Sequence, residues 1–159
     1  MKKVLLAFAI LLLVVGGIYL TQNYQKAGGT FSFFKKTATV TIDNHSFNVF
    51  IAASEQERID GLSKTKSLAL NQGMIFLFDK SDYYSFWMKN MKFPIDIIFI
   101  NNDQVVTIQS NAQIVKAQEN PTIYASTAPA NKVLEIQVGL SKKYNFKNGD
   151  KVTYENLGN

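Results

Sequence analysis

The stretch FWMKNMKFPIDIIFI, Phe86 to Ile100, decides how the rest of the sequence is interpreted. It places the only tryptophan of the chain beside a lysine and an asparagine, and it then runs into an apolar segment with a single acid. If its first part is extended, Trp87 and Lys89 point the same way, because side chains alternate along a strand. Pro94 lacks a backbone N–H, so we expect it to open a second strand. The stretch therefore predicts a wall of a pocket followed by a buried strand.

Short runs with apolar residues at alternate positions recur from residue 37 onward. Runs of this kind, rich in β-branched and aromatic residues, are typical of antiparallel strands. Many short strands favour a closed or strongly curved sheet, because closure removes unpaired edges. The sequence therefore predicts a mainly β fold, a compact antiparallel β-barrel-like domain with one short helix. The expected strands cover residues 37–42, 47–51, 74–78, 84–90, 95–100, 104–109, 132–138 and 149–155.

A helix signal follows the second predicted strand. Ser54 and Glu57, three residues apart, form a capping box, in which the hydroxyl and the carboxylate each accept a hydrogen bond from a free backbone N–H. The pattern predicts a short helix that begins at Glu55 and ends near Gly61. Arg58, the only arginine of the chain, falls on this helix. Its planar guanidinium suits a bidentate contact with a carboxylate.

Two connections are informative. The turn DNHS, residues 43–46, joins the first two strands in a hairpin and contains the only histidine, His45, which we expect to face solvent. Residues 110–131 form a long connection of mixed composition with two prolines. Connections of this length are commonly functional, so this one is a candidate flap over a site.

The N-terminus carries a membrane-targeting pattern. Residues 4–20 contain no charged side chain and follow Lys2 and Lys3, as in a signal peptide or a transmembrane anchor. No A-x-A-like cleavage site follows closely, which favours an uncleaved transmembrane helix over residues 1–22. A linker over residues 23–36 would then lead to the β domain.

The position of this segment predicts where the protein lies. A basic N-terminus favours one pass through the cytoplasmic membrane, with the β domain, residues 37–156, on the extracytoplasmic side. Cleavage of the segment would instead give a secreted protein. The absence of cysteine fits an oxidising exterior without disulfides, but it also fits many cytosolic domains.

The charge of the chain does not indicate nucleic-acid binding. The formal net charge is +5. Without the three lysines before residue 28, 14 basic and 12 acidic residues remain, with no basic run longer than two. Nucleic-acid binding requires a concentrated basic patch. The sequence also lacks a P-loop, a dinucleotide fingerprint and a zinc ligand set, so we expect no nucleic-acid partner, no cofactor and no metal.

The polar residues of the opening stretch are candidates for a binding pocket. Trp87 offers a flat stacking surface and Lys89 a charge, although a tryptophan at the rim of a core and a surface lysine give the same pattern. Asn90 is typical of a turn. Asp96 stands in an apolar strand and needs a partner if it is buried, either Lys89, Arg58 or backbone N–H groups.

A second acid, Glu135 in the run VLEIQV, raises the same question. A salt bridge from Arg58 to Asp96 or to Glu135 would be structural, whereas an arginine in a cleft would bind an anion. The two acids could also form a catalytic carboxylate pair like that of a glycosidase. Whether they can do so depends on the distance between their carboxyl groups.

Several motifs occur in the order and spacing of a known family. They are ERIDGL at 57–62, GMIFLF at 73–78, the opening stretch at 86–100, VLEIQVG at 133–139 and GD at 149–150. With these motifs the chain resembles the DUF192 family, bacterial and archaeal proteins with a domain of unknown function, from about Thr37 to Tyr154. The resemblance implies a compact β-barrel-like fold with a small helix, often behind an export signal, and it implies no activity. One departure is Ser63 and the following KTK, where the family usually continues with a methionine and a nearby arginine.

Three hypotheses follow for the function. The first is a non-catalytic domain, tethered to the membrane by its N-terminal helix, that binds an envelope saccharide or a small anionic ligand. The second is a hydrolase that uses Asp96 and Glu135, and the third is a structural envelope scaffold without a ligand. The sequence leaves the oligomeric state open. Under the first hypothesis the pocket is framed by Arg58, Trp87, Lys89, Asn90 and Asp96.

Overall fold

The computed structural model describes residues 36–115 and 120–158. The predicted membrane helix over residues 1–22 lies outside these ranges, as does the predicted linker except for Lys36. Within the described residues, no helix combines the length and the apolar composition that a bilayer crossing requires.

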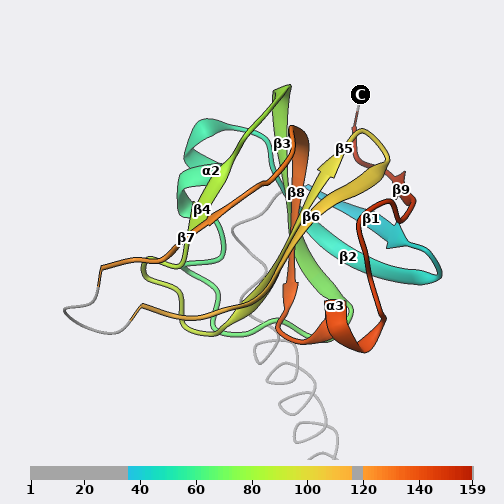
Figure 1. The fold of residues 1–159 in the computed structure, drawn as a ribbon. Helices are drawn as coiled ribbons and strands as arrows, with labels where there is room; N and C mark the ends of the chain where they lie inside the picture. The colour runs from blue at the N-terminus through green and yellow to red at the C-terminus, as the bar shows by residue number, and fades with distance from the viewer. Residues whose placement is uncertain (1–35, 116–119, 159) are drawn as a thin grey trace, which may run out of the picture. The chain divides into compact units, whose positions relative to one another are not determined.

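Seven strands form one sheet in the order β6-β5-β8-β3-β2-β1-β9 (Figure 1). The fold is mainly β, as predicted. Their bounds are β1 Thr37–Ile42, β2 His45–Ala52, β3 Gln72–Asp82, β5 Ile95–Asn101, β6 Gln104–Ala112, β8 Ala130–Gln137 and β9 Val152–Glu155.

One pairing departs from the predicted antiparallel arrangement. Strands β2 and β3 run parallel, while the other neighbours in the seven-stranded sheet are antiparallel. The chain leaves β2, forms helix α2 (Glu55–Asp60) and a loop, and then enters β3 in the same direction. A parallel pair requires such a crossover, because a tight turn can only reverse the chain.

The sheet curls into a half-barrel. Its two edge strands meet where Gln104 forms an isolated bridge with Lys151. Beside this bridge the N–H of Val105 donates to the carbonyl of Asp150 over 3.0 Å, and the N–H of Val152 donates to the carbonyl of Asp103 over 2.7 Å. These contacts pair the start of β6 with the start of β9, so part of each edge is protected as the sequence predicted.

Both faces of the sheet are buried, and strand β5 shows why its sequence is almost continuously apolar. Ile98 and Ile100 pack in one cluster of core residues, and Ile97 and Phe99 pack in a second cluster on the other face. Every β5 residue from Ile95 to Ile100 is buried. The predicted buried strand is therefore confirmed.

The second cluster lies beneath a two-stranded sheet and helix α2. Strand β4 (Ser85–Trp87) pairs antiparallel with β7 (Ile123–Ala125). The capping box of α2 is confirmed: the N–H of Glu57 donates to the hydroxyl of Ser54 over 3.3 Å, and the N–H of Ser54 donates to the Glu57 carboxylate over 2.9 Å. Strand β7 shows that part of the predicted flap is built into the fold.

A second short helix, α3 (Leu140–Lys143), was not predicted. Gly139 precedes it with φ 84°, in the left-handed region that glycine adopts without strain. The interpretation of His45 as a residue that faces solvent is also wrong. Its ring is partly buried and stacks on Tyr144, with 3.8 Å between ring centroids, because the hairpin turn occupies only residues 43 and 44.

Candidate functional site

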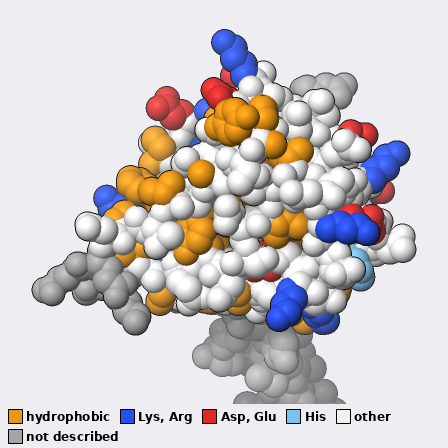
Figure 2. All heavy atoms as spheres, viewed as in Figure 1, with side chains coloured by type: hydrophobic (Ala, Val, Ile, Leu, Met, Phe, Trp, Pro, Cys, Tyr) orange, Lys and Arg blue, Asp and Glu red, His pale blue; other side chains and the backbone are white. Residues whose placement is uncertain are grey.

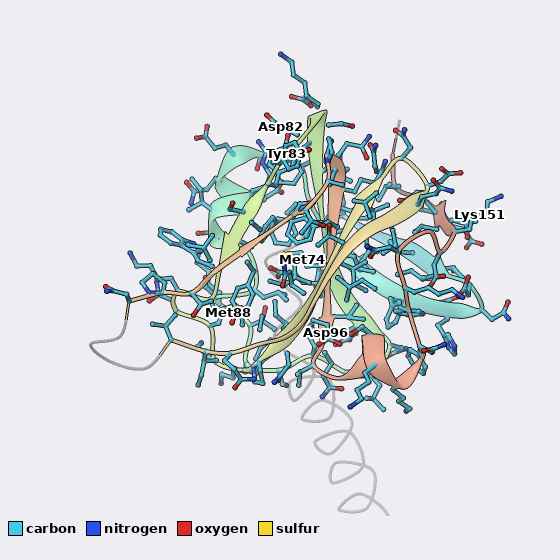
Figure 3. All side chains as sticks on the ribbon, viewed as in Figure 1. Met74, Asp82, Tyr83, Met88, Asp96 and Lys151 are labelled. Atoms are coloured by element: carbon cyan, nitrogen blue, oxygen red, sulfur yellow. The ribbon has the colours of Figure 1, made fainter. Side chains whose placement is uncertain are left out.

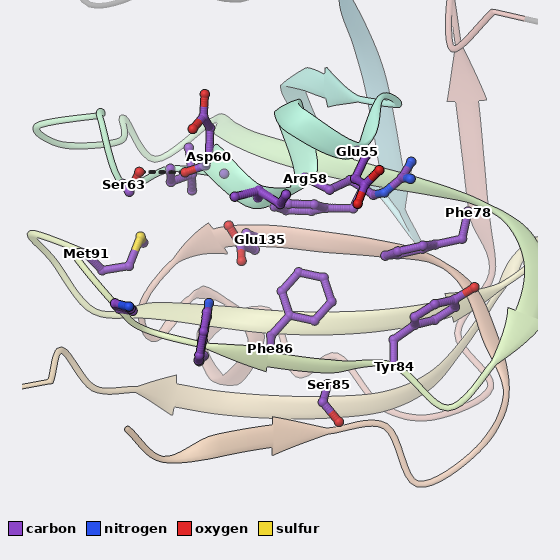
Figure 4. A pocket seen from close by; sticks show the side chains of 16 residues that line it. Glu55, Arg58, Asp60, Ser63, Phe78, Tyr84, Ser85, Phe86, Met91 and Glu135 are labelled. Carbon is purple, nitrogen blue, oxygen red and sulfur yellow. Dashed lines mark hydrogen bonds between the residues drawn. The ribbon is translucent and has the colours of Figure 1, made fainter. Parts of the chain in front are cut away.

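A pocket of about 320 Å³ opens between α2, the loop that follows it and strand β4 (Figure 4). Strand β3 contributes two phenylalanines and strand β8 contributes one acid. Its lining is mostly apolar and aromatic, which is typical of small-molecule sites. The residues that line it are Glu55, Arg58, Ile59, Asp60, Gly61, Leu62, Ser63, Phe76, Phe78, Tyr84, Ser85, Phe86, Trp87, Lys89, Met91 and Glu135.

Glu135 is the unusual group of this pocket. Its strand places it between Met74 of β3 and Ile97 of β5, and only 6% of its surface is exposed. The Oε2 atom is buried and has no hydrogen-bond partner among the described residues. In Figure 4 its carboxyl group points into the space between Arg58 on α2 and Phe86 on β4.

Burial changes the protonation of this acid. Loss of contact with water disfavours the ionised form and raises the pKa of Glu135 to about 8. A carboxyl group with this pKa carries its proton at neutral pH. Glu135 therefore presents to the pocket a neutral carboxylic acid, which can both donate and accept a hydrogen bond.

Aromatic side chains make the wall around Glu135 rigid. Phe76 and Phe86 meet edge to face, with centroids 5.0 Å apart, and Phe78 and Tyr84 stack at 3.7 Å. Phe86 also contacts Phe99 of the core edge to face, at 5.8 Å. Because these rings hold one another, the pocket is largely preformed. Side chains alternate along β4, so Phe86 faces the side opposite to Trp87. This alternation could have predicted from the sequence that Phe86 belongs to the aromatic wall.

Trp87 and Lys89 both line the rim, but the predicted strand ends at Trp87, and Lys89 follows in a turn rather than by strand alternation. The indole is 55% exposed, and the Lys89 ammonium lies 5.3 Å from the centroid of its ring. This distance is within the range of a cation–π contact. The rim therefore combines a flat apolar surface with a positive charge.

Arg58 lines the pocket but does not form the predicted salt bridge. Its Nη1 donates to the carbonyl of Leu77 over 3.1 Å and also to the carbonyl of Ala53, and its guanidinium lies 5.4 Å from the centroid of Phe78. Among the described residues, the one ion pair joins Lys64 to Asp60. Arg58 therefore ties α2 to β3 and to the residue that follows β2 through backbone carbonyls rather than through Asp96 or Glu135.

Asp96 does not share the pocket with the other predicted residues. It is fully buried beside α3 (Figure 3), where Oδ1 accepts from the N–H of Asn111 over 2.8 Å. Its Oδ2 accepts from the N–H of Ser141 over 2.9 Å and from the Ser141 hydroxyl over 2.7 Å. Of the partners considered for Asp96, backbone N–H groups are therefore the ones observed, and neither Arg58 nor Lys89 reaches it.

Asn90 also lies outside the pocket lining. It is exposed and has φ 62°, in the left-handed region that asparagine tolerates better than most residues. This geometry agrees with the interpretation of Asn90 as a turn residue. The structure thus brings together Arg58, Trp87, Lys89 and Glu135, but not Asn90 or Asp96.

The proposed carboxylate pair is wrong. In the register of β5 and β8, Asp96 is opposite Ile136, and Glu135 is opposite Ile97. Because side chains alternate between faces, Asp96 and Glu135 point to opposite sides of the sheet. Two acids separated by a sheet cannot flank one scissile bond.

The loop that departs from the family pattern closes the end of α2. The Ser63 hydroxyl donates to the carbonyl of Asp60 over 2.6 Å, and the Lys64 ammonium lies 2.7 Å from the Asp60 carboxylate. Ser63 and Asp60 both line the pocket. The substituted residues therefore shape the mouth of the pocket next to the helix.

On the face shown in Figure 2, hydrophobic side chains gather over the region of α2 and β4, while basic side chains are dispersed around the outline. Exposed apolar residues near the pocket include Ile59, at 67%, and Trp87. The pocket therefore combines exposed apolar side chains with charged lining residues of both signs, Glu55, Arg58, Asp60 and Lys89.

Comparison with known proteins locates the chain in a family. The model of the DUF192 family, described as "Uncharacterized ACR", matches residues 38–154. The chain is similar to a protein of unknown function from Novosphingobium aromaticivorans DSM 12444, whose crystal structure superposes with a TM-score of 0.66 and whose sequence is 36% identical. The match covers 74% of this chain and 83% of that protein's chain. It is also similar to the crystal structure of a Sinorhizobium meliloti 1021 protein described as a "putative transcription regulator", with a TM-score of 0.67 and 27% sequence identity. That match covers 75% of this chain and 92% of the other chain. No match was found among curated proteins.

Proposed function

The chain belongs to the DUF192 family, and because that family is described only as uncharacterized, we propose a function from the pocket itself. The domain is a non-catalytic binding module for a small organic ligand, which enters between α2 and β4 and contacts Trp87, Lys89 and Glu135. This proposal keeps three of the residues named from the sequence, Arg58, Trp87 and Lys89. It replaces Asp96 and Asn90 with Glu135.

The observation that carries the proposal is the unpartnered carboxyl of Glu135. Leaving a buried polar group without a hydrogen bond costs about 1–3 kcal/mol, so an apolar residue at this position would give a more stable fold. The cost is explained if the group is paired when a ligand is present. Asp96, on the other side of the same sheet, provides the contrast, because all its hydrogen bonds are satisfied by the protein itself.

The lining limits the size and chemistry of the ligand. A volume of about 320 Å³ is near the lower end of the roughly 300–1,000 Å³ typical of ligand sites. The aromatic wall suits a flat or apolar part, and Lys89 at the rim suits an acidic substituent. A monosaccharide-sized envelope fragment and a small anionic compound both satisfy these limits.

We also propose that the domain acts outside the cytoplasmic membrane, tethered by residues 1–22. The support is the uncharged run over residues 4–20 behind Lys2 and Lys3. Labelling of intact and of permeabilised cells with a membrane-impermeant amine reagent tests the side on which the lysines of the domain lie. Labelling of the domain only after permeabilisation would contradict this location.

A thermal-shift screen tests the proposed binding. The full-length chain, held in phospholipid bicelles, would be heated with a panel of monosaccharides, small carboxylates, phosphates, amines and heterocyclic amides. A ligand stabilises the folded state in proportion to the logarithm of its excess over Kd, so hits raise the melting temperature. We expect Trp87→Ala to keep the fold, because the side chain is 55% exposed, and to lose the shift.

Leu70→Ala is the matched control for this screen. Leu70 is also an exposed large apolar residue, at 56%, but it does not line the pocket. It should show the same thermal shifts as the unsubstituted chain. A panel without any hit, or hits that Trp87→Ala retains in full, would contradict the proposed function.

A further inference from the structure

The hydrogen-bonding capacity of Glu135 restricts the ligand more than the shape of the pocket does. A neutral carboxylic acid presents one donor and one acceptor side by side in a plane. Its best partner offers an acceptor and a donor in the matching order, as the edge of a primary or cyclic amide does. The Oε2 atom is buried without a partner, so two-point pairing requires a rotation of the carboxyl group toward the pocket, about a torsion that is soft in glutamate. A ligand that then pairs with both oxygens removes the unsatisfied group.

The surroundings of Glu135 favour a flat partner. Phe76 and Phe86 lie edge to face on one side of the space, and Trp87 exposes its indole at the rim. Ring stacking and edge contacts of this kind suit a planar aromatic ligand. A volume of about 320 Å³ accommodates a one-ring or two-ring compound in this geometry.

The pocket lining carries charges of both signs, Glu55 and Asp60 with Arg58 and Lys89, but its aromatic faces disfavour a cationic ligand. Lys89 occupies the face of Trp87, and Arg58 occupies the face of Phe78. The two rings that could bind an ammonium group by cation–π contact therefore already hold cations of the protein. The same lysine is placed to meet an acidic substituent on a ligand whose ring lies deeper in the pocket.

We propose that the pocket binds a planar heterocycle with an amide-like edge, of the nucleobase or nicotinamide type, through a two-point hydrogen bond to the carboxyl group of Glu135. This inference rests on the proposed function, since it names the ligand class of the same site. A saccharide offers hydroxyl groups that are not held in one plane, so it does not match the carboxyl group as closely. An ammonium ligand would require Glu135 to be ionised.

The test follows the fluorescence of Trp87, the only tryptophan of the chain. The full-length chain in phospholipid bicelles is titrated with nicotinamide and with uracil at pH 6. The comparison probes are N,N-diethylnicotinamide and 1,3-dimethyluracil, which keep the ring but lack the N–H donor, together with methyl glucoside and choline. We expect saturable changes with the first two, and Kd values at least about tenfold higher with their alkylated forms.

Two substitutions of Glu135 separate a structural role from a recognition role. Glu135→Gln keeps a planar donor and acceptor and should retain binding within a few-fold. Glu135→Met fills the space without either group and should weaken binding at least about tenfold, while it stays folded by thermal melting. If Glu135→Met binds nicotinamide and uracil as tightly as the unsubstituted chain, the inference is overturned.

The pH profile gives a third readout. Binding of nicotinamide, which does not itself titrate in this range, to the protonated carboxyl group should weaken about tenfold per pH unit above pH 8 in the unsubstituted chain, and it should stay flat in Glu135→Gln. Choline that binds more tightly above pH 8, with no binding of either amide, would overturn the amide class while leaving the proposed function in place. A panel in which nothing changes the fluorescence of Trp87 or the melting temperature would overturn both.

Discussion

Asp96 and Glu135 lie on adjacent strands of one sheet and face opposite sides of it, because Asp96 is opposite Ile136 and Glu135 is opposite Ile97. The two acids are both buried, but their surroundings differ. Asp96 accepts three hydrogen bonds from the protein, whereas the Oε2 atom of Glu135 accepts none among the described residues. One acid therefore serves the fold, and the other keeps an unpaired oxygen beside the pocket.

Substitution of Asp96 should affect stability rather than binding. Asp96→Asn replaces an accepting oxygen with an NH₂ group that faces other donors, and we expect a loss of about 2–4 kcal/mol in the free energy of unfolding. Urea denaturation measures this loss. Ser141→Ala, which removes only the hydroxyl donor, should cost about 1 kcal/mol. An Asp96→Asn chain as stable as the unsubstituted one would show that the hydrogen bonds to Ser141 and Asn111 contribute little.

Glu135 should make stability depend on pH. Its pKa is raised from the ordinary 4.5 to about 8 by burial, so between these values the folded state holds a proton that the unfolded state has released. The free energy of unfolding should therefore fall as pH rises from about 4.5 to 8, and this contribution should level off above pH 8. Denaturation at pH 5, 6.5 and 8 measures the slope.

Glu135→Gln is the control for that slope, because an amide does not titrate in this range. Its stability should change less between pH 5 and 8 than that of the unsubstituted chain, and it should exceed the latter at pH 8, where the buried carboxylate is ionised. If the free energy of unfolding depends equally on pH in the two chains, groups other than Glu135 cause the dependence.

Arg58 should be required for the position of α2. Arg58→Lys retains the charge but loses the planar guanidinium, whose Nη1 donates to the carbonyls of both Ala53 and Leu77. We expect a loss of about 1–3 kcal/mol in stability, together with faster hydrogen exchange of the α2 amides. Retention of full stability and exchange protection in Arg58→Lys would mean that the charge alone is sufficient.

Gly73 should not tolerate a side chain. A Cβ atom at this position would lie 2.5 Å from the carbonyl oxygen of Glu135 on the adjacent strand. Gly73→Ala should therefore separate β3 from β8 and cost about 1–3 kcal/mol, or more. Because the same movement displaces Glu135, binding at the pocket should also weaken. A Gly73→Ala chain with unchanged melting temperature would contradict this close approach.

Much of the fold could be predicted from local patterns. The patterns of apolar residues located the strands other than β7, the pair Ser54 and Glu57 located α2, and the turn DNHS located a hairpin whose end residues, Ile42 and His45, do pair. The parallel pairing of β2 and β3 could not be predicted from such patterns. Whether β3 runs parallel or antiparallel to β2 depends on the path of the chain after α2, which no local pattern determines. Helix α3 has four residues, which is too short for a periodic pattern.

The site was harder to predict than the fold. The partners of Asp96 are Asn111 and Ser141, 15 and 45 residues away in the sequence, and no local pattern connects them. Glu135 was recognised as an acid in an apolar strand, but only the pairing of β8 with β3 and β5 determines which face it takes. Trp87 and Lys89 both line the pocket, but the strand predicted to carry both ends at Trp87, so alternation alone does not account for the position of Lys89.

The most direct test of the account is the pKa of the Glu135 carboxyl group, measured by carbon-13 NMR in the full-length chain with and without nicotinamide or uracil. We expect a pKa near 8 in the free protein, and a further rise in the presence of the ligand, because a ligand that binds the protonated form stabilises it. An ordinary pKa near 4.5, or a pKa that falls or stays unchanged when either compound saturates the protein, would contradict it.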